Sequence, residues 1–246
     1  VVPKLEGRAT KGIILSRVIK TFRLAEAKVD EIVSPISRLS NPTLATYINP
    51  DGVYLRITAK GNEKTDAQRL IAQSEQQIRH ILGPYVWGVD DDTPGSVVGQ
   101  LLGGKNWSLA TMESCTEGLL CSTIAGGRES GVYFKGGLLA SCDEAKIACG
   151  VDAAIIDEYG KESIQVARAM ANTARRNLKT NVGLGLGGNI DSDTNSGEAF
   201  VGLSSDEFEK TFTHKLRGNR SRMKQRAVYA ALFDLRKTLL EEVRCT

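Results

Sequence analysis

The sequence has few histidines and no closely spaced cysteine pair, and these shortages exclude several kinds of site. Its 246 residues include two histidines, His80 and His214, so we expect neither a Ser-His-Asp nor a Cys-His catalytic site. The five cysteines are odd in number and form no C-x-x-C pair, which argues against a disulfide framework and against a zinc site. We therefore predict free thiols, a reducing cytoplasmic location and no bound metal.

Long apolar runs and a strong charge imbalance are also missing. No apolar run approaches the length of about 18 residues that a membrane span needs, and we recognise no signal peptide. A net charge of +3 is too small to indicate a nucleic-acid partner by itself. Apolar residues make up 41% and charged residues 25% of the chain, as in soluble globular proteins of one or two domains. The chain starts at Val1 rather than at Met, which leaves a larger parent protein open.

Residues 1–88 predict a small α+β unit. Its expected elements are a strand over 10–22, a helix over 24–36 that breaks at Pro35, two strands around the turn at 50–52, and an amphipathic helix over 63–82. Such a unit can resemble an RNA-binding KH domain, but the G-x-x-G loop that clamps nucleotides is absent before residue 85. We therefore favour a structural role for this unit over direct binding of nucleic acid.

Residues 85–96 contain an acidic run, a proline and glycines, which predicts a junction before a second domain at 93–246. Strands and helices alternate beyond it, and this predicts an α/β domain whose sheet is covered on both sides. The expected helices cover 94–103, 116–125, 143–149, 162–178 and 220–242, and the expected strands cover 107–112, 132–140, 181–186, 198–204 and 208–216.

The glycine-rich stretch 183–188 matches the G-x-G-x-x-G pattern of dinucleotide-binding folds. That pattern requires a helix to open at its last glycine, whereas Gly188 is followed by a run of turn residues. A calcium loop is also excluded, because Ser196 and Gly202 stand where an EF-hand needs glycine and glutamate. We predict a flexible glycine loop between two strands, able to approach a bound anion.

Three features carry polar groups that could do chemistry. Ser114 or Thr116 follows an apolar strand and could cap the next helix, where a hydroxyl meets partial positive charge. Lys146 lies on a short helix and, if buried, could serve as a base for a serine. Five cations between Arg217 and Arg226 crowd the start of the last helix, so we expect a phosphate or carboxylate partner there.

In this order, these features resemble the CinA family. The C-terminal domain of that family includes nicotinamide mononucleotide amidases, and the resemblance covers about 93–242, while residues 1–88 look like the family's KH-like middle domain. The resemblance implies a three-layer αβα fold, a homo-oligomer such as a dimer, and no cofactor. It implies that Ser114 attacks the carboxamide, that Lys146 is the base, and that backbone N–H groups hold the oxyanion. The residues expected to bind the small-molecule nucleotide are Thr116, Gly118, Ser141, Gly185, Gly187, Gly188 and Arg220.

The chain departs from the family pattern at several of these positions. Ser141 replaces a tyrosine, Glu117 replaces a glycine, and the T-G-x-A-G-P loop has become the stretch 184–189. An amidohydrolase of the nicotinamide mononucleotide type is the first expectation. A catalytically impaired relative that binds a nucleotide or a protein is the second, and a scaffold without a ligand is the third.

Overall fold

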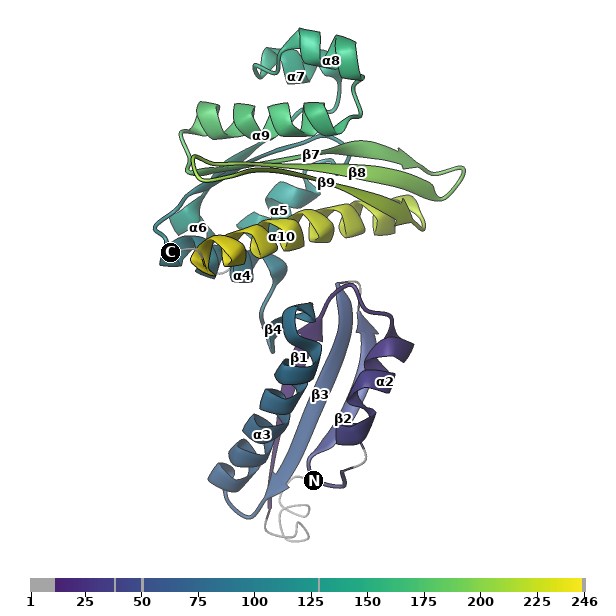
Figure 1. Ribbon diagram of the computed structural model, residues 1–246, viewed down its shortest axis with the longest axis vertical. Helices are drawn as coiled ribbons and strands as arrows, with labels where there is room; N and C mark the ends of the chain where they lie inside the picture. The colour runs from purple at the N-terminus through teal and green to yellow at the C-terminus, as the bar shows by residue number, and fades with distance from the viewer. Residues whose placement is uncertain (1–11, 38, 50, 128, 245–246) are drawn as a thin grey trace, which may run out of the picture. The chain divides into compact units, whose positions relative to one another are not determined.

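The computed structural model describes residues 12–37, 39–49, 51–127 and 129–244. The chain divides into two compact units, Val1–Asp92 and Thr93–Thr246, each with its own hydrophobic core. The residues of the first expected strand before 12, and Cys245, lie outside the described residues. We describe the two units separately (Figure 1).

In its described residues, the first unit is a four-stranded antiparallel sheet with two helices, which agrees with the small α+β unit we predicted. Its strands lie in the order β2-β3-β1-β4. Along the chain the unit comprises β1 (Ile13–Thr21), α2 (Glu26–Ser37), β2 (Thr43–Asn49), β3 (Gly52–Gly61), α3 (Lys64–Leu82), the short 3₁₀ turn η1 (Gly83–Tyr85) and β4 (Val86–Val89). Alternate residues of β3 are buried and join a core with α2 and α3, which is the period of two that a one-sided sheet requires.

Two predictions about this unit need correction. Helix α2 does not break at Pro35 but continues to Ser37. Pro35 lies in the last turn, so few backbone hydrogen bonds of the helix lie beyond it to be disrupted. Residues 86–89, which we had placed in the junction, form strand β4 and pair with β1. The run is short and contains a glycine, so its sequence alone gives a weak strand signal.

The second unit is a three-layer α/β domain, and its sheet is mixed (Figure 1). The strands lie in the order β6-β5-β7-β8-β9, with β5 parallel to both β6 and β7 and the remaining pairs antiparallel. They are β5 (Leu109–Glu113), β6 (Phe134–Leu139), β7 (Val182–Asp191), β8 (Ser196–Ser204) and β9 (Glu209–Arg217).

Helices cover both faces of this sheet. One face packs against α4 (Pro94–Gly104), α5 (Leu119–Ala125) and α10 (Arg220–Arg244), and the short α6 (Ser130–Tyr133) lies beside α4. The other face packs against α9 (Ile164–Leu178), with α7 (Asp143–Ala148) and α8 (Ala153–Tyr159) beyond it. The expected covering of both faces is thus confirmed, although neither α6 nor α8 was predicted.

The strand expected over 181–186 is confirmed, but the glycines that follow it continue the strand and do not form the flexible loop we predicted. The glycine run lies inside β7, the middle strand of the sheet, and residues 182–187 are buried. Val182, Leu184 and Leu186 face the core formed with α10, while the alternating glycines face α9. A Cβ on Gly185 would lie 2.1 Å from the Ala167 carbonyl oxygen, so the glycines allow α9 to pack directly on the strand backbone.

Candidate active site

The predicted nucleophile lies at the carboxyl end of the central parallel strands. The Ser114 backbone N–H donates to the Leu186 carbonyl at 3.0 Å, so the residue extends the pairing of β5 with β7. On the other side, the Ala140 N–H donates to the Glu113 carbonyl at 2.9 Å, which brings the end of β6 to the same edge. Open α/β sheets bind ligands at this edge, outside the carboxyl ends of their strands.

A buried carboxylate anchors the turn that carries Ser114. Glu113 is 1% exposed and accepts hydrogen bonds from the Leu120 N–H at 3.0 Å, the Cys121 N–H at 2.8 Å and the Thr116 hydroxyl. The predicted cap by Ser114 or Thr116 is therefore wrong. Helix α5 begins only at Leu119, and the Glu113 carboxylate satisfies its first N–H groups from the preceding strand.

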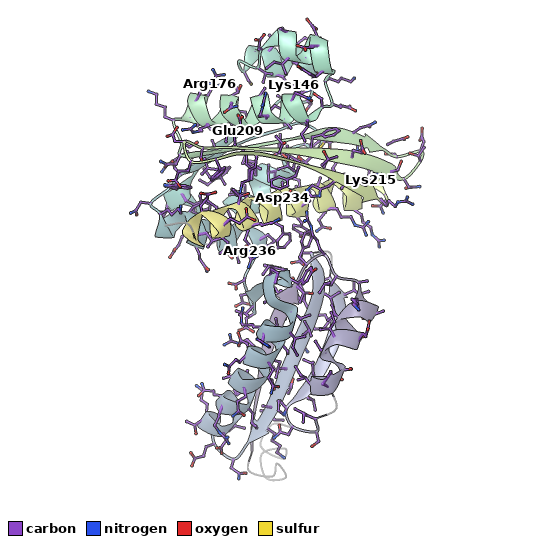
Figure 2. All side chains as sticks on the ribbon, viewed as in Figure 1. Lys146, Arg176, Glu209, Lys215, Asp234 and Arg236 are labelled. Atoms are coloured by element: carbon purple, nitrogen blue, oxygen red, sulfur yellow. The ribbon has the colours of Figure 1, made fainter. Side chains whose placement is uncertain are left out.

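The predicted base, Lys146, is buried at the side of the sheet covered by α9 (Figure 2). Its side chain is 4% exposed, and its Nζ donates to Asp143 Oδ1 at 2.9 Å and to the Lys161 carbonyl at 3.2 Å. The described residues provide no hydrogen-bond partner for the Ser114 hydroxyl within 3.5 Å. The amine and the hydroxyl are therefore not in direct contact, and Lys146 donates instead to two oxygen acceptors.

Both side chains nevertheless line one pocket of about 480 Å³. Ser141, Gly188 and Arg220 line it as well, so five of the expected site residues meet there. Thr116 is 1% exposed and turned to Glu113, and Gly185 faces α9. Gly187 lies next to the pocket, since a Cβ built on it would be 3.7 Å from Ser114 Oγ, and Gly118 is the residue before α5.

Cys115 follows Ser114 and is the other potential nucleophile of the turn. Burial raises the pKa of its thiol to about 12, and the neighbouring carboxylate of Glu113 adds to the rise. A thiol with such a pKa carries almost no thiolate at neutral pH, and the thiolate is the reactive form. Of the two side chains, Ser114 is therefore the better candidate nucleophile. Among the described residues, no cluster of His, Cys, Asp and Glu side chains is placed to hold a metal ion.

The basic residues at the start of α10 have the carboxylate partner that their position requires. Glu117 binds Arg220 at 2.5 Å and also binds Lys224, and Glu117 and Arg220 both line the pocket. The hydrogen bond from Lys224, followed by that from Arg220, lowers the pKa of the Glu117 carboxyl. The cation cluster at this helix N-terminus is therefore partly neutralised within the chain itself.

Sequence reasoning did not identify Glu113, Asp143 or the Lys161 carbonyl as parts of this site. Glu113 could have been identified from the sequence, because it is a charged residue at the end of a strand whose other residues are uncharged. Asp143 is three residues before Lys146 on a helix, a spacing that places the two side chains together. The contribution of Lys161 is a backbone carbonyl, which no side-chain pattern reveals.

Comparison with known families decides the lineage. The family described as the CinA C-terminal domain matches residues 92–239, and the family described as the damage-inducible protein CinA KH domain matches residues 16–88. The chain belongs to the CinA family. This membership accounts for the order of motifs around Ser114 and Lys146.

Full-length CinA relatives are longer than this chain. A protein of Caldanaerobacter subterraneus subsp. tengcongensis, whose name calls it competence-damage inducible, is 39% identical over 95% of this chain and 58% of its own length. A "CinA-like protein" of Acaryochloris marina is 35% identical over 93% of this chain and 57% of its own length. The chain thus spans less than two thirds of these relatives.

Solved CinA superfamily structures share the fold. A protein from Klebsiella pneumoniae has a TM-score of 0.56 at 18% identity, with 60% of this chain and 96% of its own covered. One from Escherichia coli has a TM-score of 0.54 at 21% identity, with 65% of this chain and 98% of its own covered. In the described part of the present chain, no helix is both long and apolar enough to cross a membrane.

Proposed function

We propose that the pocket at the carboxyl end of β5 hydrolyses a carboxamide, as in an amidohydrolase of the nicotinamide mononucleotide type. The observation that carries the proposal is the shared lining of one pocket by Ser114 and the buried Lys146. A serine and a lysine together can perform acyl transfer in the absence of a histidine, provided that the lysine is neutral when it accepts the proton. The small-molecule substrate would enter the pocket from solvent.

In this proposal each residue has a defined task. The Ser114 oxygen attacks the carboxamide carbon, Lys146 takes the hydroxyl proton and delivers it to the leaving ammonia, and water then releases the acid. Backbone N–H groups of the turn after Ser114 are the candidates for holding the oxyanion, and Glu113 keeps that turn in place. Both the Lys146 amine and the Ser114 hydroxyl must reorganise when substrate binds, because no hydrogen bond joins them in the described residues.

One observation favours a second function, binding without turnover. Lys146 donates hydrogen bonds to Asp143 and to the Lys161 carbonyl. This arrangement suits a lysine with a structural role as well as one with a catalytic role. The pocket could then hold a nucleotide or a partner without cleaving it. The two functions differ in a single measurable product, ammonia.

Ammonia release from nicotinamide mononucleotide tests the proposal. We expect turnover by the wild-type chain and a loss of about 10³-fold or more in Ser114→Ala and Lys146→Met, since each removes a reacting group. Ser122→Ala is the matched control, because this exposed serine on α5 lies outside the pocket lining and should leave the rate unchanged. Retained melting temperatures would show that the variants fold. Equal rates in the wild type and Ser114→Ala would refute the amidase, and binding without ammonia would support the second function.

A further inference from the structure

The pocket carries more negative than positive side chains. Its described lining includes the carboxylates Glu117, Asp143, Glu144 and Glu162 and the cations Lys146, Lys161 and Arg220. Asp143 already pairs with Lys146, and Glu117 pairs with Arg220. A phosphate dianion entering this pocket would meet Lys161, two cations that carboxylates of the chain already bind, and carboxylates that repel it.

Glu117 is held where an anionic ligand group would otherwise bind. Arg220 and Lys224 lie one helical turn apart on the first turns of α10, where N–H groups and the helix dipole favour an anion. Each cation contacts a different oxygen of the Glu117 carboxylate, so both oxygens are occupied. The carboxylate thereby binds both cations near the start of the helix.

The backbone at this position supports the same interpretation. Glu117 has a φ of +56° and is followed by Gly118 with a φ of +90°, so two successive residues adopt left-handed conformations. A non-glycine residue is uncommon there and carries some strain, which the ion pairs with Arg220 and Lys224 offset. A smaller residue at this position could adopt the same backbone conformation.

We propose that Glu117 is a specificity residue that excludes phosphate from Arg220 and Lys224, so that the site prefers a carboxamide-bearing nucleoside without a phosphate over the corresponding nucleotide. The substrate class named here rests on the proposed amidase function. The carboxylate is a covalently attached competitor, and a phosphate must displace it before binding the two cations. The side chains of Glu117 and Arg220 are 48% and 54% exposed, so solvent screening makes the discrimination moderate rather than absolute.

Binding of two probes tests the inference without requiring turnover. Nicotinamide riboside and nicotinamide mononucleotide share the carboxamide and differ by the phosphate. Calorimetry at low salt should show that Glu117→Gln, which keeps the size and removes the charge, tightens mononucleotide binding by about fivefold or more. The affinity for nicotinamide riboside should change by less than about twofold, because this probe has no phosphate that could bind the two cations once Glu117 no longer pairs with them.

Two further variants make the result specific. Glu144→Gln removes the same charge from the same pocket but leaves Arg220 and Lys224 paired, and it should alter the preference between the probes much less than Glu117→Gln. Adding Arg220→Gln to Glu117→Gln should abolish most of the gain in mononucleotide binding. Equal changes for both probes, an equal effect of Glu144→Gln, or no binding of either probe to any variant would overturn the inference. The expected shift in preference without ammonia release would uphold the inference and reject only the amidase.

Discussion

At the scale of single residues, the candidate site contains buried side chains that can ionise. Glu113 is the clearest case, because burying a carboxyl group to 1% exposure would be costly without its three hydrogen-bond donors. Those donors belong to the turn and helix that follow Ser114, so the carboxylate fixes the position of the nucleophile relative to α5. In the proposed reaction, Glu113 would therefore be a positioning residue that acts only through the backbone of the turn.

Cys115 makes the stability of the protein depend on pH in the alkaline range. Its thiol has a pKa of about 12 in the folded chain and 9.0 as the ordinary value, so above pH 9 the unfolded chain releases a proton that the folded chain keeps. The stabilisation is therefore complete below pH 9 and is lost as pH rises toward 12. Between pH 8 and pH 10, the free energy of unfolding of the wild type should fall by about 1 kcal/mol more than that of Cys115→Ala.

Urea denaturation at the two pH values measures this difference. Cys142→Ala serves as the control, because the Cys142 side chain is exposed at the start of α7 and should leave the pH dependence of the wild type intact. Parallel pH curves for the wild type and Cys115→Ala would contradict the assignment. Other groups that titrate in this range cancel in the comparison, since they are common to all three proteins.

At the scale of elements, the contact between β7 and α9 depends on glycine. A Cβ at position 185 would lie 2.1 Å from the Ala167 carbonyl oxygen and 2.7 Å from the Ala171 nitrogen, and backbone atoms cannot move aside as a side chain can. Gly185→Ala should therefore lower the free energy of unfolding by about 1–3 kcal/mol, as overpacking of a core does. It should also displace the end of β7 that forms the rim of the pocket.

Gly103→Ala is the matched control for this substitution. Gly103 lies in helix α4, is exposed, and has no atom within 4 Å of a built Cβ. The same added methyl group should there leave stability unchanged or raise it by about 0.5–1 kcal/mol. Urea denaturation distinguishes the two, and equal small effects would show that α9 does not need glycine beneath it.

The same elements show what the sequence could predict and what it could not. Long periodic segments such as α3 and α10 were found, because their apolar stripes dictate a helix whatever surrounds them. The strand expected over 181–186 was found, but it continues to Asp191 where we predicted a flexible glycine loop, and the need for glycine within the strand appears only once α9 is packed against it. The partner of the α10 cations was expected to be a carboxylate or a phosphate, but their pairing with Glu117 spans 103 residues and depends on tertiary structure.

At the scale of the whole molecule, the candidate site belongs to one unit. Every residue that lines the pocket lies within Thr93–Thr246, and the hydrophobic clusters of that unit share no residue with the cluster of the first unit. The two units also match two separate families, which indicates that each is a folding module. The pocket should therefore not require the KH-like unit for its shape.

A chain of residues 93–246 tests this independence. It should unfold in one cooperative transition and bind nicotinamide riboside within about threefold of the affinity of the whole chain, because its core and pocket are complete. Circular dichroism during urea titration and calorimetry with the same probe supply the two readouts. A folded fragment that has lost binding would assign the first unit a part in ligand recognition, because folding of the fragment would exclude damage to the core. A fragment that fails to fold would instead show that the first unit stabilises the second.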